Sequence, residues 1–313
     1  MEKYILPFNM DPPIKCYLHD LHPLGVIFTQ PYEKCIQWLL NKYYKLTYGH
    51  NLMSIECKDI EADYDSIFKR YCIAFPLEIC NEKMIKEFLH KVFSLNFYCA
   101  GYFNEKFTPG YASYMKGDFP HAFLIRGYDI TNDELYCVGY PNGFVDEVKI
   151  NVKNLYEAIS GFISILGGNF YIQYYKLNED FIYPSFDIGL FKECIYKFIN
   201  SENILNEGIN ALNTLKNTII NNEYIDQRNI FVIYEYNKLM YLRIQVLYGN
   251  GYIKNNAYES EYKSIVENCL RLINLVIKYN ILPKINIKDR IINIYENTIN
   301  RMINILSSLY NEI

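Results

Sequence analysis

The hydrophobic pattern changes in the segment KLNEDFIYPSFD at residues 176–187, from a mixture in which helical-looking pieces such as EKMIKEFLHKVFSL precede alternating runs to a helical pattern throughout. Before this segment, runs such as HAFLIRGYD and NFYIQYYKL alternate between apolar and polar positions. After it, apolar residues recur every three or four positions, as Ile265, Cys269, Leu272 and Val276 do. The first pattern is typical of half-buried strands and the second of amphipathic helices. The sequence therefore predicts an α+β protein whose second part is all helical.

The length of 313 residues leaves room for two hydrophobic cores of roughly 150 residues each. We expect a mixed domain over residues 1–178 and a helical domain over residues 186–313. Within the first, Asn142-Gly143 separates two alternating runs, and this dipeptide suits a tight turn. The strands that follow His121 are therefore expected to form a local antiparallel meander.

Composition excludes several classes of protein. A formal net charge of -4 does not favour nucleic acid as the main partner. The first residues hold no apolar run long enough for a secretion signal, and no later run is long enough to cross a bilayer, so we expect a cytoplasmic protein with no membrane segment. The nine cysteines form no C-x-x-C pair, which argues against a disulfide framework or a zinc site.

Cys16 and His121 are the residues most suited to chemistry. A cysteine nucleophile works as a thiolate, which a helix N-terminus and a nearby imidazole both favour. Asp11 and Pro12 resemble the cap and first residue of a helix that would carry Cys16, although a start after Pro13 is also compatible. His121 heads an alternating strand and is the expected base. The alternative is that both residues are structural, as most cysteines and many histidines are.

His19 and His22 follow Cys16 at three-residue steps and raise the question of a metal site. On a helix, however, Cys16 and His22 would lie about 240° apart and could not share one ligand sphere. We expect no metal and no other cofactor.

Residue patterns around Cys16 and His121 resemble a known family. H-A-F-L-I-R-G-Y-D followed by a hairpin to L-Y-C-V-G-Y-P looks like the histidine strand of papain-fold cysteine peptidases that cleave bacteriocin leaders. It is closer to the acyltransferase family of butirosin biosynthesis protein H, and similar to the amide-forming cysteine-protease homologues of closthioamide-type thioamide peptide pathways. The family's layout, with an N-terminal cysteine and a helical C-terminal half, covers nearly the whole chain.

The resemblance implies a papain-like domain and a cysteine-dependent acyltransferase of antibiotic biosynthesis. Such an enzyme joins an acyl group from the phosphopantetheine thioester of an acyl or peptidyl carrier protein to a small amine, through a Cys16 acyl-enzyme and a His121 base. The family's third member, an Asp or Asn before proline, is replaced here by Tyr140, so Tyr140, Asn142 or Asp129 could orient the imidazole. The peptidases' oxyanion glutamine is replaced by Met10, which leaves Asn9 as the candidate donor together with the Cys16 backbone N–H.

Two other functions remain open at this stage. The same cysteine and histidine could serve a papain-fold peptidase, or the fold could be an inactive scaffold that binds a partner. The helical half is expected to cover the groove or to dock the carrier protein through basic residues such as Lys238, Arg243 or Lys254.

Overall fold

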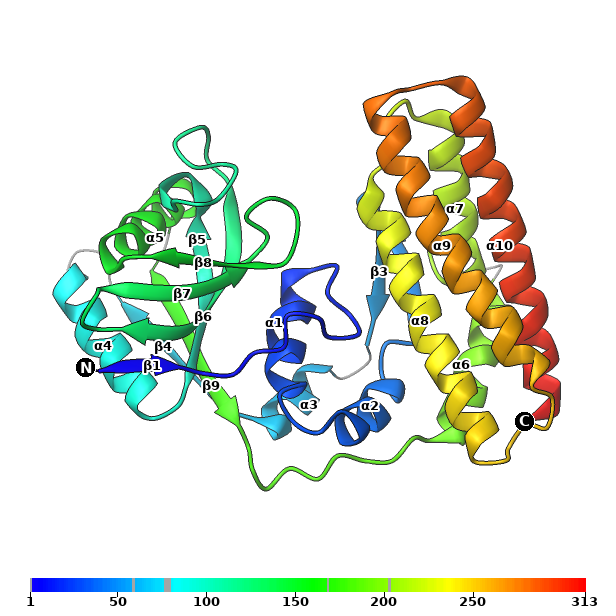
Figure 1. Cartoon of the computed structure of the whole chain (residues 1–313), viewed down its shortest axis with the longest axis horizontal. Coiled ribbons are helices and arrows are strands. Elements are labelled where there is room, and N and C mark those ends of the chain that lie inside the picture. Colours follow the sequence, from blue (N-terminus) through cyan, green and yellow to red (C-terminus); the bar gives the residue numbers. More distant parts are fainter. Residues whose placement is uncertain (1, 58–59, 76–79, 168, 202–203) are drawn as a thin grey trace. The chain divides into compact units, whose positions relative to one another are not determined.

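The structure is a computed structural model that describes residues 2–57, 60–75, 80–167, 169–201 and 204–313 (Figure 1). It divides into two compact units. Unit 1 comprises Met1–Tyr32 and Glu61–Ile182, and unit 2 comprises Glu33–Ile60 and Tyr183–Ile313. The division near residue 182 falls in the segment where the sequence pattern changes. The expected domains differ from these units in one respect, because Glu33–Ile60 belongs with the helical part.

Unit 1 is built on one antiparallel sheet. Its strand order is β4-β9-β5-β6-β7-β8, with β1 added to β6. The three strands β6, β7 and β8 pair in sequence order, which confirms the predicted meander. The strands are β1 (Lys3–Ile5), β4 (Phe68–Phe75), β5 (Tyr98–Asn104), β6 (Pro120–Asp129), β7 (Glu134–Gly139), β8 (Asp146–Ile150) and β9 (Phe170–Leu177).

Helices flank this sheet. They are α1 (Leu18–Ile27), α3 (Ile60–Ile67), α4 (Glu82–Ser94) and α5 (Val152–Leu166), with a short 3-10 turn, η1 (Glu105–Phe107), after β5. The side chains of Asn81 and Asn151 cap α4 and α5 by accepting from backbone N–H groups at 3.1 and 2.8 Å. α4 and α5 pack on each other and on β5, while α1 contacts β6.

α1 begins at Leu18, with Tyr17 at the N-cap, and not at Pro12. Asn9 accepts a hydrogen bond from the Asp11 backbone N–H at 2.8 Å, which forms a local turn instead of a helical one. Pro13 then disfavours helical geometry at the residue before it. The helix start predicted at Asp11 and Pro12 is therefore wrong.

Unit 2 combines a helical bundle with a small hairpin. Its helices are α2 (Tyr32–Leu40), α6 (Ile188–Ile199), α7 (Gly208–Asn221), α8 (Gln227–Gly249), α9 (Ala257–Ile281) and α10 (Ile285–Glu312), and its hairpin pairs β2 (Lys45–Gly49) with β3 (Leu52–Glu56). The hairpin packs on α7 and α8. Within the described residues the chain thus has ten α-helices and is about 53% helical, so the expected α+β class is confirmed. None of these helices has both the length and the hydropathy needed to cross a membrane.

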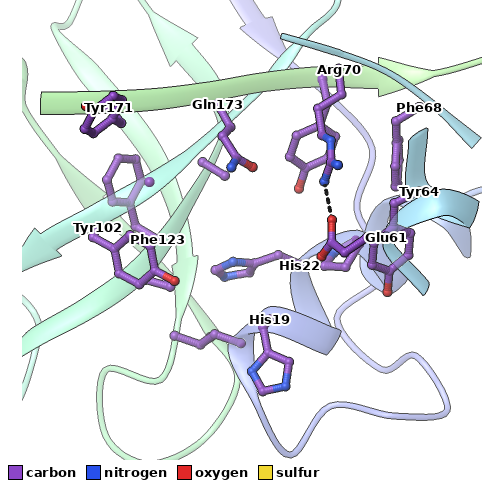
Figure 2. Close-up of a pocket in the computed structure, with 16 residues that line it drawn as sticks. His19, His22, Glu61, Tyr64, Phe68, Arg70, Tyr102, Phe123, Tyr171 and Gln173 are labelled. Atoms are coloured by element: carbon purple, nitrogen blue, oxygen red, sulfur yellow. Dashed lines mark hydrogen bonds and ion pairs between the residues drawn. The ribbon is translucent and has the colours of Figure 1, made fainter. Parts of the chain in front are cut away.

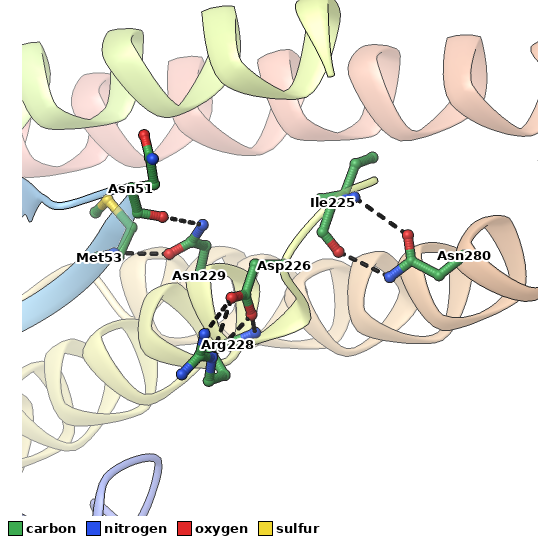
Figure 3. A network of polar contacts seen from close by, with 7 residues as sticks. All are labelled: Asn51, Met53, Ile225, Asp226, Arg228, Asn229 and Asn280. Atoms are coloured by element: carbon green, nitrogen blue, oxygen red, sulfur yellow. Dashed lines mark hydrogen bonds and ion pairs between the residues drawn. The ribbon is translucent and has the colours of Figure 1, made fainter. Parts of the chain in front are cut away.

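Two asparagines bind backbone in unit 2 through both atoms of their amides (Figure 3). Asn229, which is 2% exposed on α8, accepts from Met53 N–H at 2.7 Å and donates to the Asn51 carbonyl at 3.2 Å. Asn280 does the same for the N–H and carbonyl of Ile225, at 3.2 and 2.7 Å. The hairpin and the segment that leads into α8 are therefore held by specific polar contacts as well as by apolar packing.

Arg243 on α8 is completely buried in the same unit. Its guanidinium donates to the carbonyls of Leu40 and Lys42 at 3.0 and 2.6 Å and lies 4.1 Å from the centre of the Tyr44 ring. Because Leu40 ends α2, the arginine satisfies carbonyls that the helix leaves unpaired. Arg243 therefore cannot dock a carrier protein, and that expectation is wrong for this residue.

Replacing Arg243 by methionine is expected to destabilise the protein by about 3 kcal/mol, because buried carbonyls lose their donors. Arg271→Met, at an exposed position of α9, is the matched control and should change stability by less than about 0.5 kcal/mol. Urea unfolding of both variants measures the difference. Equal stability of the two would show that Arg243 has no structural role.

Candidate active site

His121 lies at the start of β6, beside the last residues of β5. The two strands pair so that Phe103 is opposite His121. Two positions further along, Glu105 N–H donates to the Phe119 carbonyl at 3.0 Å. Side chains of diagonal neighbours in an antiparallel pair are within reach of each other. The hairpin register therefore brings Glu105 to His121.

The Glu105 carboxylate bonds directly to the imidazole. Its Oε1 lies 2.6 Å from Nδ1 of His121, and its Oε2 accepts from the Ser113 hydroxyl at 3.1 Å. The Glu105 side chain is 5% exposed and the His121 side chain 32% exposed. Because a carboxylate accepts, Nδ1 carries the proton, which leaves Nε2 as the nitrogen that can take up or release one. This is the arrangement that orients a general base.

The loop between β5 and β6 is held by its own polar contacts. Asn104 is fully buried, and its Oδ1 accepts from the backbone N–H groups of Lys106 and Phe119 at 3.1 and 3.0 Å. Its amide nitrogen donates to Asp118 at 2.9 Å. These bonds fix both ends of the loop, and with them the position of Glu105.

Cys16 directly precedes the N-cap of α1 and is half-buried. Cys16 therefore lies just before the positive end of this helix and not in its first turns, so the alternative start directly after Pro13 is wrong as well. The neighbouring residue is bound to the sheet, because the Tyr140 hydroxyl donates to the Lys15 carbonyl. Tyr140 follows β7, whose Val138 pairs with Leu124 of β6. The Cys16 segment is thus attached to the end of the strand that runs beside the start of β6.

The other candidates for the third member of the site lie elsewhere. Asp129 is at the opposite end of β6 from His121, where it accepts from Asn132 and pairs with Lys3 at 3.6 Å. It lies eight positions along the strand from His121, a distance of roughly 26 Å. Asn142 is exposed in the turn after β7. Tyr140 binds the Lys15 carbonyl, so its place is beside the cysteine segment.

Asn9, the candidate oxyanion donor, uses its amide locally. Its Oδ1 accepts from Asp11 N–H, and its Nδ2 is directed at the Phe28 carbonyl, 3.5 Å away. The first backbone N–H groups of α1 lie next to Cys16 in the chain and are the better candidates for an oxyanion, since a helix leaves them unpaired.

The sequence interpretation missed Glu105 because it looked for the partner after the histidine. The signal was present in the hairpin. Once YCAGYFN is taken as the strand that pairs with HAFLIRG, Glu105 falls diagonal to His121, 16 positions before it. A buried carboxylate just past the end of a strand is then the natural partner of an imidazole on the next strand.

A cavity of about 290 Å³ lies under α1 within unit 1 (Figure 2). His19 and His22 of α1 line it, together with Ala122 and Phe123, the two residues after His121. The opposite walls come from α3, β4, β5 and β9. The other lining residues that Figure 2 labels are Glu61, Tyr64, Phe68, Arg70, Tyr102, Tyr171 and Gln173.

His22 is 5% exposed, and its Nε2 lies 3.2 Å from the Val138 carbonyl. Burial lowers the pKa of His22 to about 3, the carbonyl opposes this shift, and the nearby charge of His121 adds to it. His22 is therefore neutral at physiological pH. Because a carbonyl can only accept, the proton is on Nε2 and Nδ1 is an acceptor.

Most of the other cysteines are unsuited to catalysis. Burial raises the pKa of six thiols, to about 11 for Cys35 and Cys194 and to about 12 for Cys269, and it also raises the pKa of Cys80, Cys99 and Cys137. These thiols stay protonated near neutral pH and react slowly. Cys72, by contrast, is exposed on β4 and provides an internal reference for reactivity.

Comparison of the chain with models of known protein families found no match, and comparison with curated proteins found none.

Iodoacetamide at neutral pH is expected to alkylate Cys16 faster than the exposed Cys72, because a helix N-terminus favours a thiolate and, in the pairing that the sequence predicts, so does the His121 imidazole. His121→Ala should slow labelling of Cys16 and leave Cys72 unchanged. Peptide mapping by mass spectrometry gives both rates in one sample. Equal rates at the two cysteines in the native protein would contradict a catalytic role for Cys16.

Acid should destabilise the fold through His22. A pKa of about 3 in the folded state lies below the unfolded value of about 6.5, so the stability that neutral His22 provides is complete above pH 6.5 and is lost as the pH falls towards 3. His22→Gln keeps a donor for Val138 but cannot titrate, so its stability should fall less steeply over this range.

His19→Gln is the matched control, because the His19 side chain is 73% exposed on the same helix. Urea midpoints measured at intervals between pH 7 and pH 3 compare the three proteins. If the urea midpoints of His22→Gln and the native protein fell equally with pH, protonation of His22 would not be the cause of the acid destabilisation.

Proposed function

We propose that the chain is a cytoplasmic cysteine-dependent acyltransferase that forms an amide bond from a carrier-protein-bound acyl thioester and an amine in antibiotic biosynthesis. Cys16 is its nucleophile and His121 its base, in a papain-like domain, as the family resemblance implies. The observation that carries the proposal is the Glu105 carboxylate on Nδ1 of His121, 2.6 Å away. A buried carboxylate in this position fixes the tautomer that a base requires and stabilises the imidazolium that forms.

The reaction has two halves. In the first, Nε2 of His121 takes the Cys16 proton, the sulfur attacks the thioester carbonyl, and the carrier thiol leaves with the proton from His121. In the second, the amine attacks the Cys16 thioester, His121 takes a proton from the amine nitrogen, and the Cys16 sulfur leaves. The amide is more stable than the thioester, so the exchange requires no other source of energy.

The same groups could hydrolyse a peptide, which is the alternative function. Transfer is preferred because a thioester releases a thiol, and a thiol is a better leaving group than the amine that a peptidase must protonate. Incubation with an acyl-carrier thioester and an amine separates the two functions. Amide product supports transfer, hydrolysis of peptides alone supports a peptidase, and neither product supports an inactive scaffold.

Unit 2 is proposed to dock the carrier protein. Lys254 is exposed and Lys238 half-buried, so Lys254 is the better of the two remaining basic candidates for an acidic carrier helix. Lys254→Glu should raise KM for the carrier-bound substrate and leave KM for a small thioester unchanged. Kinetics with both substrates measure this, and equal effects on the two would refute docking.

Glu105→Gln is expected to lower kcat/KM for acyl transfer on the order of 10²-fold, because an amide can turn its NH₂ group to Nδ1 and favour the wrong tautomer. Glu87→Gln is the matched control, since that carboxylate is 68% exposed on α4 and its loss should not alter the rate. The rates are measured by separating the amide product by chromatography at timed intervals. Full activity of Glu105→Gln would overturn the role of the pair.

A further inference from the structure

The cavity under α1 has the size of a single ring. At about 290 Å³ it lies at the lower limit of ligand pockets and above the roughly 150 Å³ that holds benzene in an engineered cavity. Much of its wall is aromatic. Tyr64, Phe68, Phe123 and Tyr175 are buried, whereas Tyr102 and Tyr171 are exposed, at 59% and 57%. Such a wall favours a flat apolar group, which it can contact face to edge.

The charged residues of the cavity already have partners. Arg70 pairs with Glu61 at 2.9 Å and with Asp65 at 2.5 Å. His19 stacks on Tyr17, with ring centres 5.4 Å apart. A charged ligand would therefore find no uncommitted countercharge among the described lining residues.

His22 offers a polar atom to a ligand. His22 lines the cavity, and Figure 2 shows its ring between Phe123 on one side and Glu61 on the other. Its Nε2 is committed to the Val138 carbonyl, and no hydrogen bond within the described residues uses Nδ1. Nδ1 is thus an acceptor in the cavity wall to which a donor on a ligand can bind. The site therefore selects for a donor on the ligand.

We infer that this cavity binds an uncharged aromatic ring that carries one hydrogen-bond donor, a hydroxyl or an N–H group, which donates to Nδ1 of His22. Gln173 lines the same cavity and can bind the polar end of such a ligand, because its amide both donates and accepts. Ala122, which lines the cavity, directly follows His121 in β6. Resting on the proposed function, the ring belongs to the acyl group of the thioester substrate.

Binding is tested with the full chain carrying Cys16→Ala, so that no chemistry is required. The probes are the 2-, 3- and 4-hydroxyphenylacetamides, each paired with its methyl analogue of similar shape, and hexanamide. Calorimetry should show at least one hydroxyl probe binding about fivefold more tightly than its methyl partner, with hexanamide weakest. Because methyl is the more apolar group, this order requires a hydrogen bond.

Two variants locate the site. In His22→Leu the preference for hydroxyl should disappear, while Ala122→Leu should weaken all ring probes at least tenfold by filling the cavity. Ala62→Leu, at an exposed position of α3 outside the cavity wall, is the control and should bind normally. If His22→Leu fails to fold, the hydroxyl and methyl probes with the parent protein, and the loss of binding in Ala122→Leu, still test the inference.

Equal binding of hydroxyl and methyl probes, or binding unaffected by Ala122→Leu, would overturn the inference. The proposed function is tested separately, by transfer in the native protein. Acyl transfer without ring binding would support the proposed function and refute the ring site. Ring binding without acyl transfer would support the ring site and refute the proposed function.

Discussion

The geometry of the candidate site depends on the register between β5 and β6. This register places Phe103 opposite His121 and the Glu105 backbone opposite Phe119. The Glu105 carboxylate and the His121 imidazole are therefore brought together by the pairing of these two strands alone. A shift of one residue would turn Glu105 to the other face of the sheet. Phe103 and Phe123 oppose such a shift, because both are 1% exposed and pack against each other with ring centres 5.1 Å apart. Apolar packing between β5 and β6 therefore sets the positions of Glu105 and His121 relative to each other.

Burial of the Glu105 carboxylate needs an explanation, because an ionised carboxylate is costly to remove from water. Its two oxygens are bonded to His121 and Ser113, which offsets part of this cost. A neutral side chain could fill the same space with less risk to stability. Only one member of the pair is buried, because the Glu105 side chain is 5% exposed and the His121 side chain is 32% exposed. A structural ion pair has no need of one accessible partner, whereas a base that exchanges protons with a substrate does.

The parts of the fold that could be predicted are those set by local pattern. Strands β6 to β9 and the helices after residue 187 follow directly from their apolar spacing, because each spacing matches one secondary structure. The membership of Glu33–Ile60 in the helical unit could not be predicted. It depends on contacts such as Arg243 with the Leu40 carbonyl, which join positions 203 residues apart. Periodicity shows that a segment is buried but not what buries it. The same limit hid Glu105, whose role exists only once two strands are paired.

The two imidazoles near the site have environments that suit opposite tasks. His22 of α1 is buried against Val138 of β7. Burial lowers the pKa of His22 to about 3, so its ring stays neutral. His121 lies close enough to contribute to that shift, yet it has a carboxylate on Nδ1. If both rings could become charged, each would oppose protonation of the other. Burial keeps His22 neutral, whereas Nδ1 of His121 lies 2.6 Å from the Glu105 carboxylate. The two rings thus differ in chemistry: His121 bonds to a carboxylate through Nδ1, whereas His22 stays neutral and presents Nδ1 as an acceptor.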